Sequence, residues 1–276
     1  MPDREPLRSL ALAAAEAASD VIRRRAGDTA ALAAEEKAAG DYVTAVDREA
    51  EAAAIAVLRE GAPDIAVVGE EAGGQGGDRS WVVDPVDGTT NLVRGFPVVG
   101  VSVALMEDRR PVVGAVAAPH LGAIWSAVEG GGAQDGAGRP LRVSRRAPRE
   151  CVVATGFPFR RKDEATLARY LSVFMGALIT FEDMRRAGAA SVDLAYAAQG
   201  VFDGFFELNL GLWDIAAGAL LVRAAGGVVT DWLGNEEDVF ASGNILAGSP
   251  GWHEAMLSIT TAVMEGEQAA HGERPS

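Results

Sequence analysis

A short acidic segment constrains this chain more than any other feature. The apolar run Trp81–Val83 is followed directly by Asp84-Pro85-Val86-Asp87-Gly88-Thr89. The apolar run predicts a buried strand, and the ends of strands commonly present functional side chains on a rigid scaffold. Two carboxylates beside a glycine and a hydroxyl offer oxygen ligands for a hard cation next to backbone N–H groups for an anion. The segment therefore predicts a joint site for a metal ion and a phosphate.

The local geometry of this segment supports that interpretation. Pro85 fixes φ, so we expect the chain to turn and both carboxylates to face one point. The Val86 carbonyl lies inside the turn and is a candidate additional ligand. Gly88 permits close backbone approach or positive φ, and a helix beginning at Gly88-Thr89-Thr90 would offer free N–H groups to a phosphate.

The spacing of the two aspartates separates two kinds of phosphatase chemistry. Haloacid-dehalogenase-like enzymes use Asp-x-Asp, in which the nucleophile and its acid/base partner are two residues apart. Asp84 and Asp87 are three residues apart. The sequence therefore disfavours an aspartyl-phosphate intermediate, and a metal-activated water is the expected nucleophile.

The charge of the chain limits the partners that we expect. The 276 residues include 39 acidic and 25 basic ones, and the formal net charge of −14 repels nucleic acid and anionic lipid. If the substrate carries a phosphate, bound cations must therefore mediate its binding to this acidic protein. Local basic clusters at Arg142, Arg145, Arg146 and Arg149 and at 160–162 are interpreted as solvated surface. We expect a small phosphorylated metabolite as partner, and neither nucleic acid nor a membrane.

Cysteine and histidine usage removes several function classes. The single cysteine, Cys151, excludes an internal disulfide, and the three scattered histidines suggest neither a structural zinc site nor a Ser/His/Asp arrangement. The N-terminal region carries charges among its alanines and no unbroken apolar stretch, so neither a signal peptide nor a membrane span is expected. We expect a cytoplasmic protein.

Hydrophobic periodicity predicts an α+β protein in layers. Helical spacing over Leu7–Arg25 and Asp41–Leu58 predicts two N-terminal helices, for which Asp41 or Thr44 could cap the second. Further helices are expected at 163–174, 189–199, 213–225 and 252–264. Strands are expected at 65–68, 80–83, 98–106, 111–118, 123–128 and 140–143, the last four as an antiparallel meander.

No linker in the chain separates independent domains. Residues 1–276 are therefore expected to form one catalytic domain of two closely packed subdomains, roughly 1–145 and 146–265. The polar tail at 266–276 is expected to be disordered.

Four motifs in order resemble the inositol monophosphatase family. They are Asp41-Tyr42-Val43-Thr44-Ala45-Val46-Asp47 preceded by Lys37, Gly69-Glu70-Glu71, the segment from Trp81 to Asn91, and Trp213-Asp214-Ile215-Ala216-Ala217-Gly218 followed by the segment from Ala225 to Asp231. The resemblance covers residues from about 37 to 248. It implies the layered αβαβα sandwich of the inositol monophosphatase and fructose-1,6-bisphosphatase type. It also implies Mg²⁺-dependent hydrolysis of a small phosphomonoester, with myo-inositol monophosphate as the leading candidate.

The resemblance also assigns roles to individual residues of this sequence. Two to three Mg²⁺ ions would be held by Glu70, Asp84, the Val86 carbonyl, Asp87 and Asp214. The catalytic residues would be Glu70, Thr89 and Asp84, with Glu70 and Thr89 orienting and deprotonating the attacking water. The substrate would contact Asp87, Gly88, Thr89, Gly188, Ala190, Glu207 and Asp214. Three further residues would contact the metal ligands without binding the ions themselves: Glu71, Asp47 and Lys37.

Several alternatives stay open from the sequence. Enzymes of the same fold act on other substrates, namely fructose 1,6-bisphosphate, histidinol phosphate, nucleotide 3′-phosphates and NADP. A non-catalytic regulatory role is also open. Histidinol phosphate is disfavoured, because its branch tends to carry Lys where this chain has Thr90. Ala189 stands where many members carry Ser or Thr, which would alter hydroxyl recognition. Lithium sensitivity and a homodimer are further implications of the resemblance.

Overall fold

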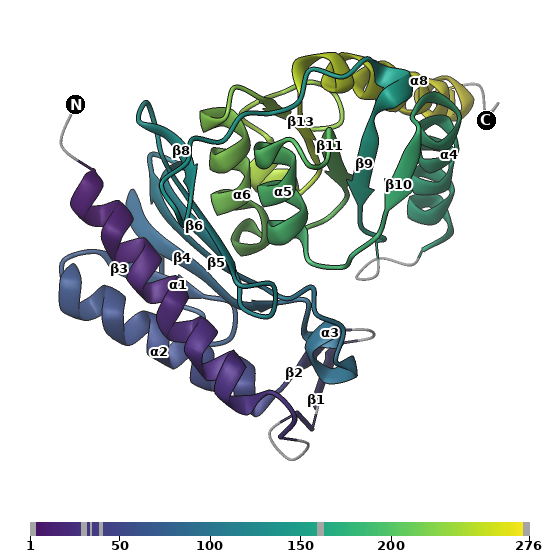
Figure 1. Cartoon of the computed structure of the whole chain (residues 1–276). Helices are drawn as coiled ribbons and strands as arrows, with labels where there is room; N and C mark the ends of the chain where they lie inside the picture. The colour runs from purple at the N-terminus through teal and green to yellow at the C-terminus, as the bar shows by residue number, and fades with distance from the viewer. Residues whose placement is uncertain (1–3, 29–31, 34, 39–40, 159–162, 273–276) are drawn as a thin grey trace.

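The computed structural model describes residues 4–28, 32–33, 35–38, 41–158 and 163–272 (Figure 1). The elements of the first half are α1 (Glu5–Arg25), β1 (Glu35–Ala38), β2 (Asp41–Val43), α2 (Ala45–Gly61), β3 (Ala66–Gly69), β4 (Arg79–Asp87), α3 (Thr89–Arg94), β5 (Gly100–Glu107), β6 (Arg110–Ala118), β7 (Ala123–Val128) and β8 (Gly132–Asp135). Those of the second half are η1 (Pro148–Glu150), β9 (Val152–Thr155), α4 (Glu164–Thr180), β10 (Asp183–Arg185), α5 (Ala190–Gln199), β11 (Gly204–Glu207), α6 (Leu212–Ala224), β12 (Val228–Thr230), α7 (Val239–Ser242), β13 (Ile245–Gly248) and α8 (Pro250–Gly272).

Two large sheets divide these elements between them. The first has the order β3-β4-β5-β6-β7-β8, in which only the β3–β4 pair is parallel. The second has the order β10-β9-β11-β13-β12, with β13 antiparallel to both of its neighbours. The two sheets fall on either side of the subdomain boundary expected near residue 145. The division into subdomains itself stays a prediction.

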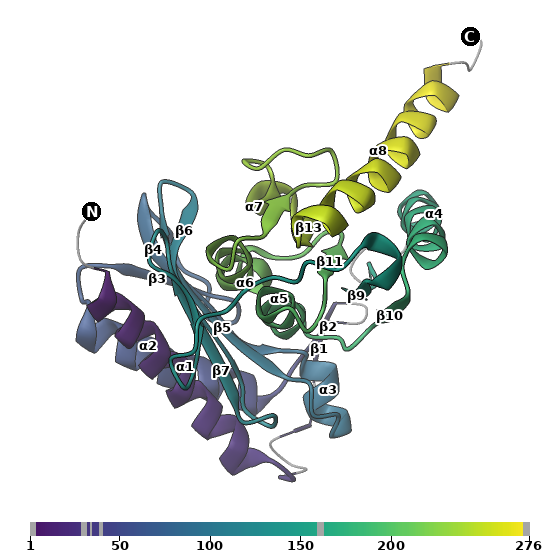
Figure 2. The same cartoon turned by 45° about the horizontal axis from the view of Figure 1, so that its top comes forward.

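Helices cover the sheets in five layers. Helices α1 and α2 pack on the outer face of the first sheet, α5 and α6 lie between the two sheets, and α4 and α8 cover the outer face of the second (Figures 1 and 2). This order of layers is αβαβα, so the predicted fold class is confirmed.

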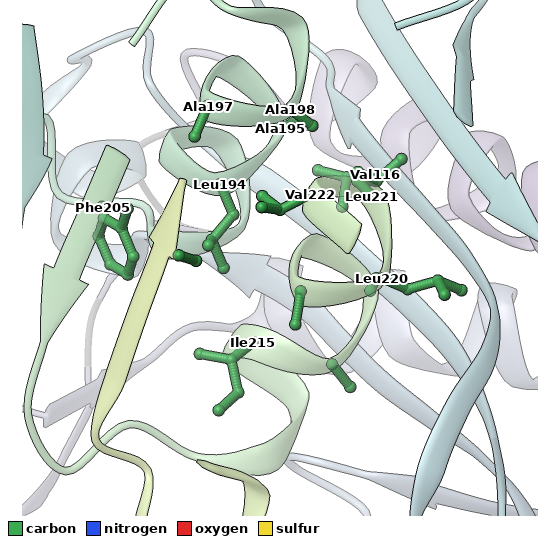
Figure 3. Close-up of a cluster of buried hydrophobic side chains, with 14 of the residues drawn as sticks. Val116, Leu194, Ala195, Ala197, Ala198, Phe205, Ile215, Leu220, Leu221 and Val222 are labelled. Atoms are coloured by element: carbon green, nitrogen blue, oxygen red, sulfur yellow. The ribbon is translucent and has the colours of Figure 1, made fainter. Parts of the chain in front are cut away.

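The central layer explains why α6 has no polar face. A helix that is apolar all round is buried all round, and the residues from Asp214 to Val222 are all buried. Small residues let it approach the sheets closely, since a Cβ on Gly114 of β6 would lie 3.1 Å from the backbone of Ala217. Figure 3 shows Ile215, Leu220 and Leu221 of α6 with Leu194 of α5, packed between strands of both sheets.

Two local predictions are wrong. Asp41 does not cap a helix, because Asp41–Val43 is a strand that pairs with β1, and α2 begins at Ala45 behind Thr44. Thr44 caps α2 in a reciprocal capping box with Asp47. Pro140–Val143 is irregular apart from one bridge at Pro140, and the fourth strand of the meander is instead Gly132–Asp135.

The C-terminal helix α8 is longer than expected. It continues to Gly272, well into the tail that the sequence analysis places outside the folded part, and residues 273–276 lie outside the described residues. Within the described part of the chain, no helix combines the length and the apolar character needed to cross a bilayer.

Candidate active site

A β-bulge in β4 brings the two aspartates of the acidic segment to one face of the sheet. Side chains alternate along a strand, so residues three apart normally point to opposite faces. In β4, however, Asp84 pairs with Ser102 and Asp87 with Gly100, so β4 has one residue more than β5 over this stretch. Val86 accordingly packs on the α1–α2 side. Asp84 and Asp87 therefore both lie on the face towards α5 and α6, and the two carboxylates face one point as the sequence analysis expects.

Asp87 is held by the second half of the chain. Its Oδ2 accepts hydrogen bonds from the backbone N–H and the hydroxyl of Ser191, each at 2.6 Å. Ser191 lies in the first turn of α5, whose N-cap residue Ala189 has no capping side chain. The carboxylate of Asp87 therefore caps α5 from across the molecule, where a negative charge also suits the helix dipole.

Asp214 enters the site from the first turn of α6. Its Oδ2 accepts a hydrogen bond from the Gly211 N–H at 2.6 Å, which fixes the side chain at the start of the helix. Asp84, Asp87 and Asp214 each offer a carboxylate oxygen, and these three oxygens lie within 4.8 Å of one another. The structure thus brings together three of the five predicted metal ligands as one cluster.

The metal-free cluster is electrostatically unfavourable. Burial raises the pKa of Asp84 well above its ordinary value, and the carboxylates of Glu70, Asp87 and Asp214 raise it further. Burial, with Asp214, raises the pKa of Asp87 to about 7 despite the hydrogen bonds from Ser191. Asp84 Oδ1 accepts the Val86 N–H at 2.9 Å, but Asp84 Oδ2 is buried with no donor among the described residues. The cluster is therefore short of positive charge.

Glu70 lies beside this cluster, in the turn after β3. When one of the two carboxyls carries a proton, Glu70 hydrogen-bonds Asp84. The loop that carries Glu70 is fixed from α2, because the buried Glu51 accepts the backbone N–H groups of Glu71 and Ala72 at 2.9 and 2.7 Å. Glu51 was missed by the sequence analysis, and its only signal is an acid on the apolar face of a helix.

Thr89 and Asp47 form a second polar group next to the cluster. The Thr89 hydroxyl lies 2.9 Å from Asp47 Oδ1 and 3.2 Å from the Val86 carbonyl oxygen. Asp47 Oδ2 accepts both the N–H and the hydroxyl of Thr44. Asp47 is therefore placed to orient Thr89, while the Val86 carbonyl points to the same spot.

The carboxylates open into a cavity of about 370 Å³ between the two halves of the chain. This volume suits a small metabolite. Nearly all the predicted site residues line it: Glu70, Asp84, Val86, Asp87, Gly88, Thr89, Gly188, Ala190, Glu207 and Asp214. Asp47 lies behind this wall, in contact with Thr89. Glu71 lies away from the cavity, in a hollow against α2, and the side chain of Lys37 lies outside the described part of the structure.

Gly88 is required at its position, where the two halves of the chain approach each other. Its φ is +94°, and a Cβ would lie 3.0 Å from the Gly188 carbonyl oxygen. We expect Gly88→Ala to lower the free energy of unfolding by roughly 1–3 kcal/mol, because it adds left-handed strain and a steric overlap. Urea titration measures this loss. Gly122→Ala is the matched control, since Gly122 also has positive φ but nothing within 4 Å; equal losses in both variants would contradict the role of close approach.

Asp193 and Arg186 are cavity residues that the sequence analysis missed. Asp193 of α5 is 1% exposed, and burial together with Asp87 raises its pKa well above its ordinary value. Arg186 opposes this rise, and its guanidinium also lies over the ring of Phe157 at 5.5 Å. The available signal for Asp193 is an acid three residues after Ala190, inside an otherwise apolar helix.

A profile of the inositol monophosphatase family matches residues 3–265, nearly the entire chain. The chain belongs to the inositol monophosphatase family. The resemblance stated from the sequence is thus confirmed, and with it a phosphatase-type fold whose acidic cluster suits metal binding.

Relatives within the inositol monophosphatase family are similar over almost their full length. The Nus factor SuhB of Pseudomonas aeruginosa is 42% identical over 260 residues, which are 92% of this chain and 95% of that protein. The Nus factor SuhB of Escherichia coli K12 is 39% identical over 256 residues, which are 92% of this chain and 95% of that protein. Among solved structures, the extragenic suppressor protein suhB of Bartonella henselae matches with a TM-score of 0.84 and 36% identity, over 91% of this chain and 97% of that one. The Thermotoga maritima IMPase matches with a TM-score of 0.81 and 30% identity, over 94% and 97%.

These names correct the expected partners. The two relatives named above are Nus factors, so the expectation that nucleic acid is excluded from the partners is wrong. The expectation rested on the net charge of −14, which sums over the whole chain. Net charge says nothing of local patches, or of partners that are reached through another protein.

Proposed function

We propose that this family member hydrolyses a small phosphomonoester in the presence of Mg²⁺, with myo-inositol monophosphate as the candidate substrate. The observation that carries the proposal is the cluster of Asp84, Asp87 and Asp214 beside the backbone of Gly88 and Thr89. It offers ligands for cations and N–H groups for a phosphate within one cavity.

The residues present fit divalent cations. The donors are hard oxygens, the Oδ2 atom of Asp84 is buried without a donor, and the neighbouring carboxylates repel one another. The residues that would hold the ions are those predicted from the sequence: Glu70, Asp84, Val86 through its carbonyl, Asp87 and Asp214. When bound, Mg²⁺ would supply Lewis acidity at the phosphate and neutralise the converging negative charges.

The protein's own groups would position the reactants on the phosphate side. Gly88 and Thr89 line the cavity, and their backbone N–H groups would hold phosphate oxygens. The Thr89 hydroxyl, oriented by Asp47, and the Glu70 carboxylate would orient a water and take its proton. This assignment gives Asp47 a positioning role, because it sets the direction in which the Thr89 hydroxyl points.

Groups of the second half would receive the alcohol part of the substrate. Glu207, at the end of β11, is buried, and Asp214, Asp193 and Asp87 add to burial in raising its pKa well above the ordinary value. A raised pKa favours the protonated carboxyl, which donates one hydrogen bond and accepts others. Glu207, with the backbone of Gly188 and Ala190, would therefore suit the hydroxyl groups of a polyol.

Release of inorganic phosphate from myo-inositol 1-phosphate tests this proposal. We expect Mg²⁺-dependent release, abolished by EDTA and inhibited by millimolar Li⁺. The other substrate classes of the fold (fructose 1,6-bisphosphate, histidinol phosphate, nucleotide 3′-phosphates and NADP) form the comparison panel, ranked by kcat/KM. Absence of Mg²⁺-dependent release across this panel would refute the hydrolytic proposal.

We infer a second function from the names of the relatives, namely a regulatory role with the transcription machinery in the cytoplasm. The support is that two cited relatives about 40% identical to this chain are named Nus factors. Pull-down of RNA polymerase complexes by the tagged protein tests this role. Retention of an Asp84→Asn variant on the same complexes would separate it from hydrolysis, and absence of any transcription component from the pull-down would refute it. The homodimer stays a prediction of the resemblance, tested by mass in solution.

A further inference from the structure

A second cavity lies where the segment between β8 and β9 passes the start of α8. Its volume is about 810 Å³, and its walls come from Arg142–Arg146, the end of α6 at Ala225, and Ser249 to Gly251. In Figure 1 this segment runs along the top of the molecule, away from α3 and the β1–β2 hairpin. The cavity shares no lining residue with the candidate active site.

The charge of this cavity is opposite to that of the protein as a whole. Arg142, Arg145 and Arg146 line it, and no Asp or Glu of the described residues does. Arg146 is paired with the buried Asp203 at 3.0 Å. Among the described residues, neither Arg142 nor Arg145 makes an ion pair; Arg142 only donates to the neighbouring Leu141 carbonyl. Two guanidinium groups are thus available to an anion.

The wall that faces these arginines has a buried hydroxyl without a partner. Ser249 is 2% exposed, and its Oγ has no hydrogen-bond partner in the described structure. Ser249 directly precedes Pro250, the first residue of α8, so the first turn of a 23-residue helix opens on the same cavity. The first turn of a helix has backbone N–H groups without intrahelical acceptors, and these favour an anion.

The remaining wall does not offer a competing cation site. The carbonyls at the end of α6 already have donors: Val143 N–H bonds the Ala225 carbonyl, and Gly226 and Gly227 bond those of Arg223 and Val222. A Cβ on Gly251 would meet nothing within 4 Å, so the space in front of the helix start is open.

We propose that this cavity binds a phosphate group through Arg142, Arg145, the Ser249 hydroxyl and the first turn of α8. The phosphate of a small phosphorylated molecule and that of a nucleic-acid chain share this chemistry. Two free guanidinium groups match the paired oxygens of a phosphate, and the Ser249 hydroxyl can donate to a third.

Titration with inorganic phosphate in EDTA tests the proposal. EDTA removes cations from the acidic site, so binding there does not contribute, and the outcome does not depend on the proposed hydrolysis. We expect saturable binding by calorimetry and by ³¹P line broadening, weakened at least about tenfold in an Arg142→Ala/Arg145→Ala variant. Arg110→Ala, at an exposed arginine outside the cavity, is the matched control and should bind as the unmodified protein does.

A second variant separates a loss of phosphate binding from a loss of folding. Gly251→Asp places a carboxylate in the open space at the start of α8, where negative charge favours the helix, so the protein should keep its melting temperature and lose phosphate binding. No saturable binding below about 50 mM phosphate, or equal binding by all variants, would overturn the proposal.

Comparison of inorganic phosphate with one further ligand identifies the source of the phosphate. A short single-stranded RNA that binds more tightly than inorganic phosphate, and loses this advantage in the double variant, assigns the cavity to nucleic acid. Tighter binding of free phosphate than of RNA assigns it to a small phosphorylated molecule.

Discussion

Asp84→Asn is expected to lower phosphate release by at least about 1,000-fold while making the metal-free protein more stable. The loss of activity follows because the amide removes a charged ligand from the centre of the cluster, and the ions that it would hold are expected to contribute several kcal/mol to the transition state. The gain in stability follows because Asp84 is buried against Glu70, Asp87 and Asp214, and the neutral amide removes that repulsion. The two effects have opposite signs, which a damaged fold would not produce.

Steady-state phosphate release and thermal unfolding in EDTA measure these two effects. Glu237→Gln is the matched control, because it also replaces an acid by its amide, at an exposed ion pair with Arg110. We expect it to leave activity unchanged and stability within about 0.5 kcal/mol. Full activity in Asp84→Asn, or a lower melting temperature in EDTA, would contradict the assignment of Asp84.

Saturating Mg²⁺ is expected to raise the melting temperature by roughly 5–10 °C at pH 8 and by much less at pH 5. The pKa of Asp87 is raised to about 7 in the metal-free fold, from an ordinary value of 3.8. Between these values the folded protein holds a proton that the unfolded chain has lost. The free energy of unfolding therefore falls by about 1.4 kcal/mol per pH unit for this group as the pH rises towards 7. Mg²⁺ competes with that proton, so it binds best above pH 7.

Calorimetric melting at pH 5 and pH 8, in EDTA and in excess Mg²⁺, tests this linkage. Asp84→Asn serves as the control for specific binding, and its melting temperature should respond much less to Mg²⁺ at pH 8. The same Mg²⁺ response at both pH values would show that the ions do not compete with protons in this cluster.

The candidate site was predictable from the sequence because most of its acids follow short, well-marked elements. Asp84 and Asp87 end a strongly apolar strand around a proline, and Asp214 stands in the first turn of an apolar helix. The convergence of these three carboxylates depends on long-range packing, however. Nothing local indicates that Asp87 caps α5 through Ser191, 104 residues later.

The errors have equally local causes. Asp41–Val43 is too short for its periodicity to separate strand from helix, and its strand pairing with β1 decided the outcome. Asp193 and Glu51 were missed because an acid in an apolar helix resembles an exposed residue until the neighbouring layers are placed. Arg142, Arg145 and Arg146 are exposed, as expected for solvated surface, but the cavity that they line could not be predicted because it forms only where α8 begins beside them.

The contact between Asp87 and the start of α5 has a consequence for biosynthesis. Asp84, Asp87 and Thr89 are made early in translation, whereas Ser191, Glu207 and Asp214 emerge only after the first sheet is complete. A nascent chain that stops near residue 145 would carry Asp84 and Asp87 without Asp214 and without the start of α5 that holds Asp87. The proposed hydrolytic site would therefore be complete only once α6 has been synthesised.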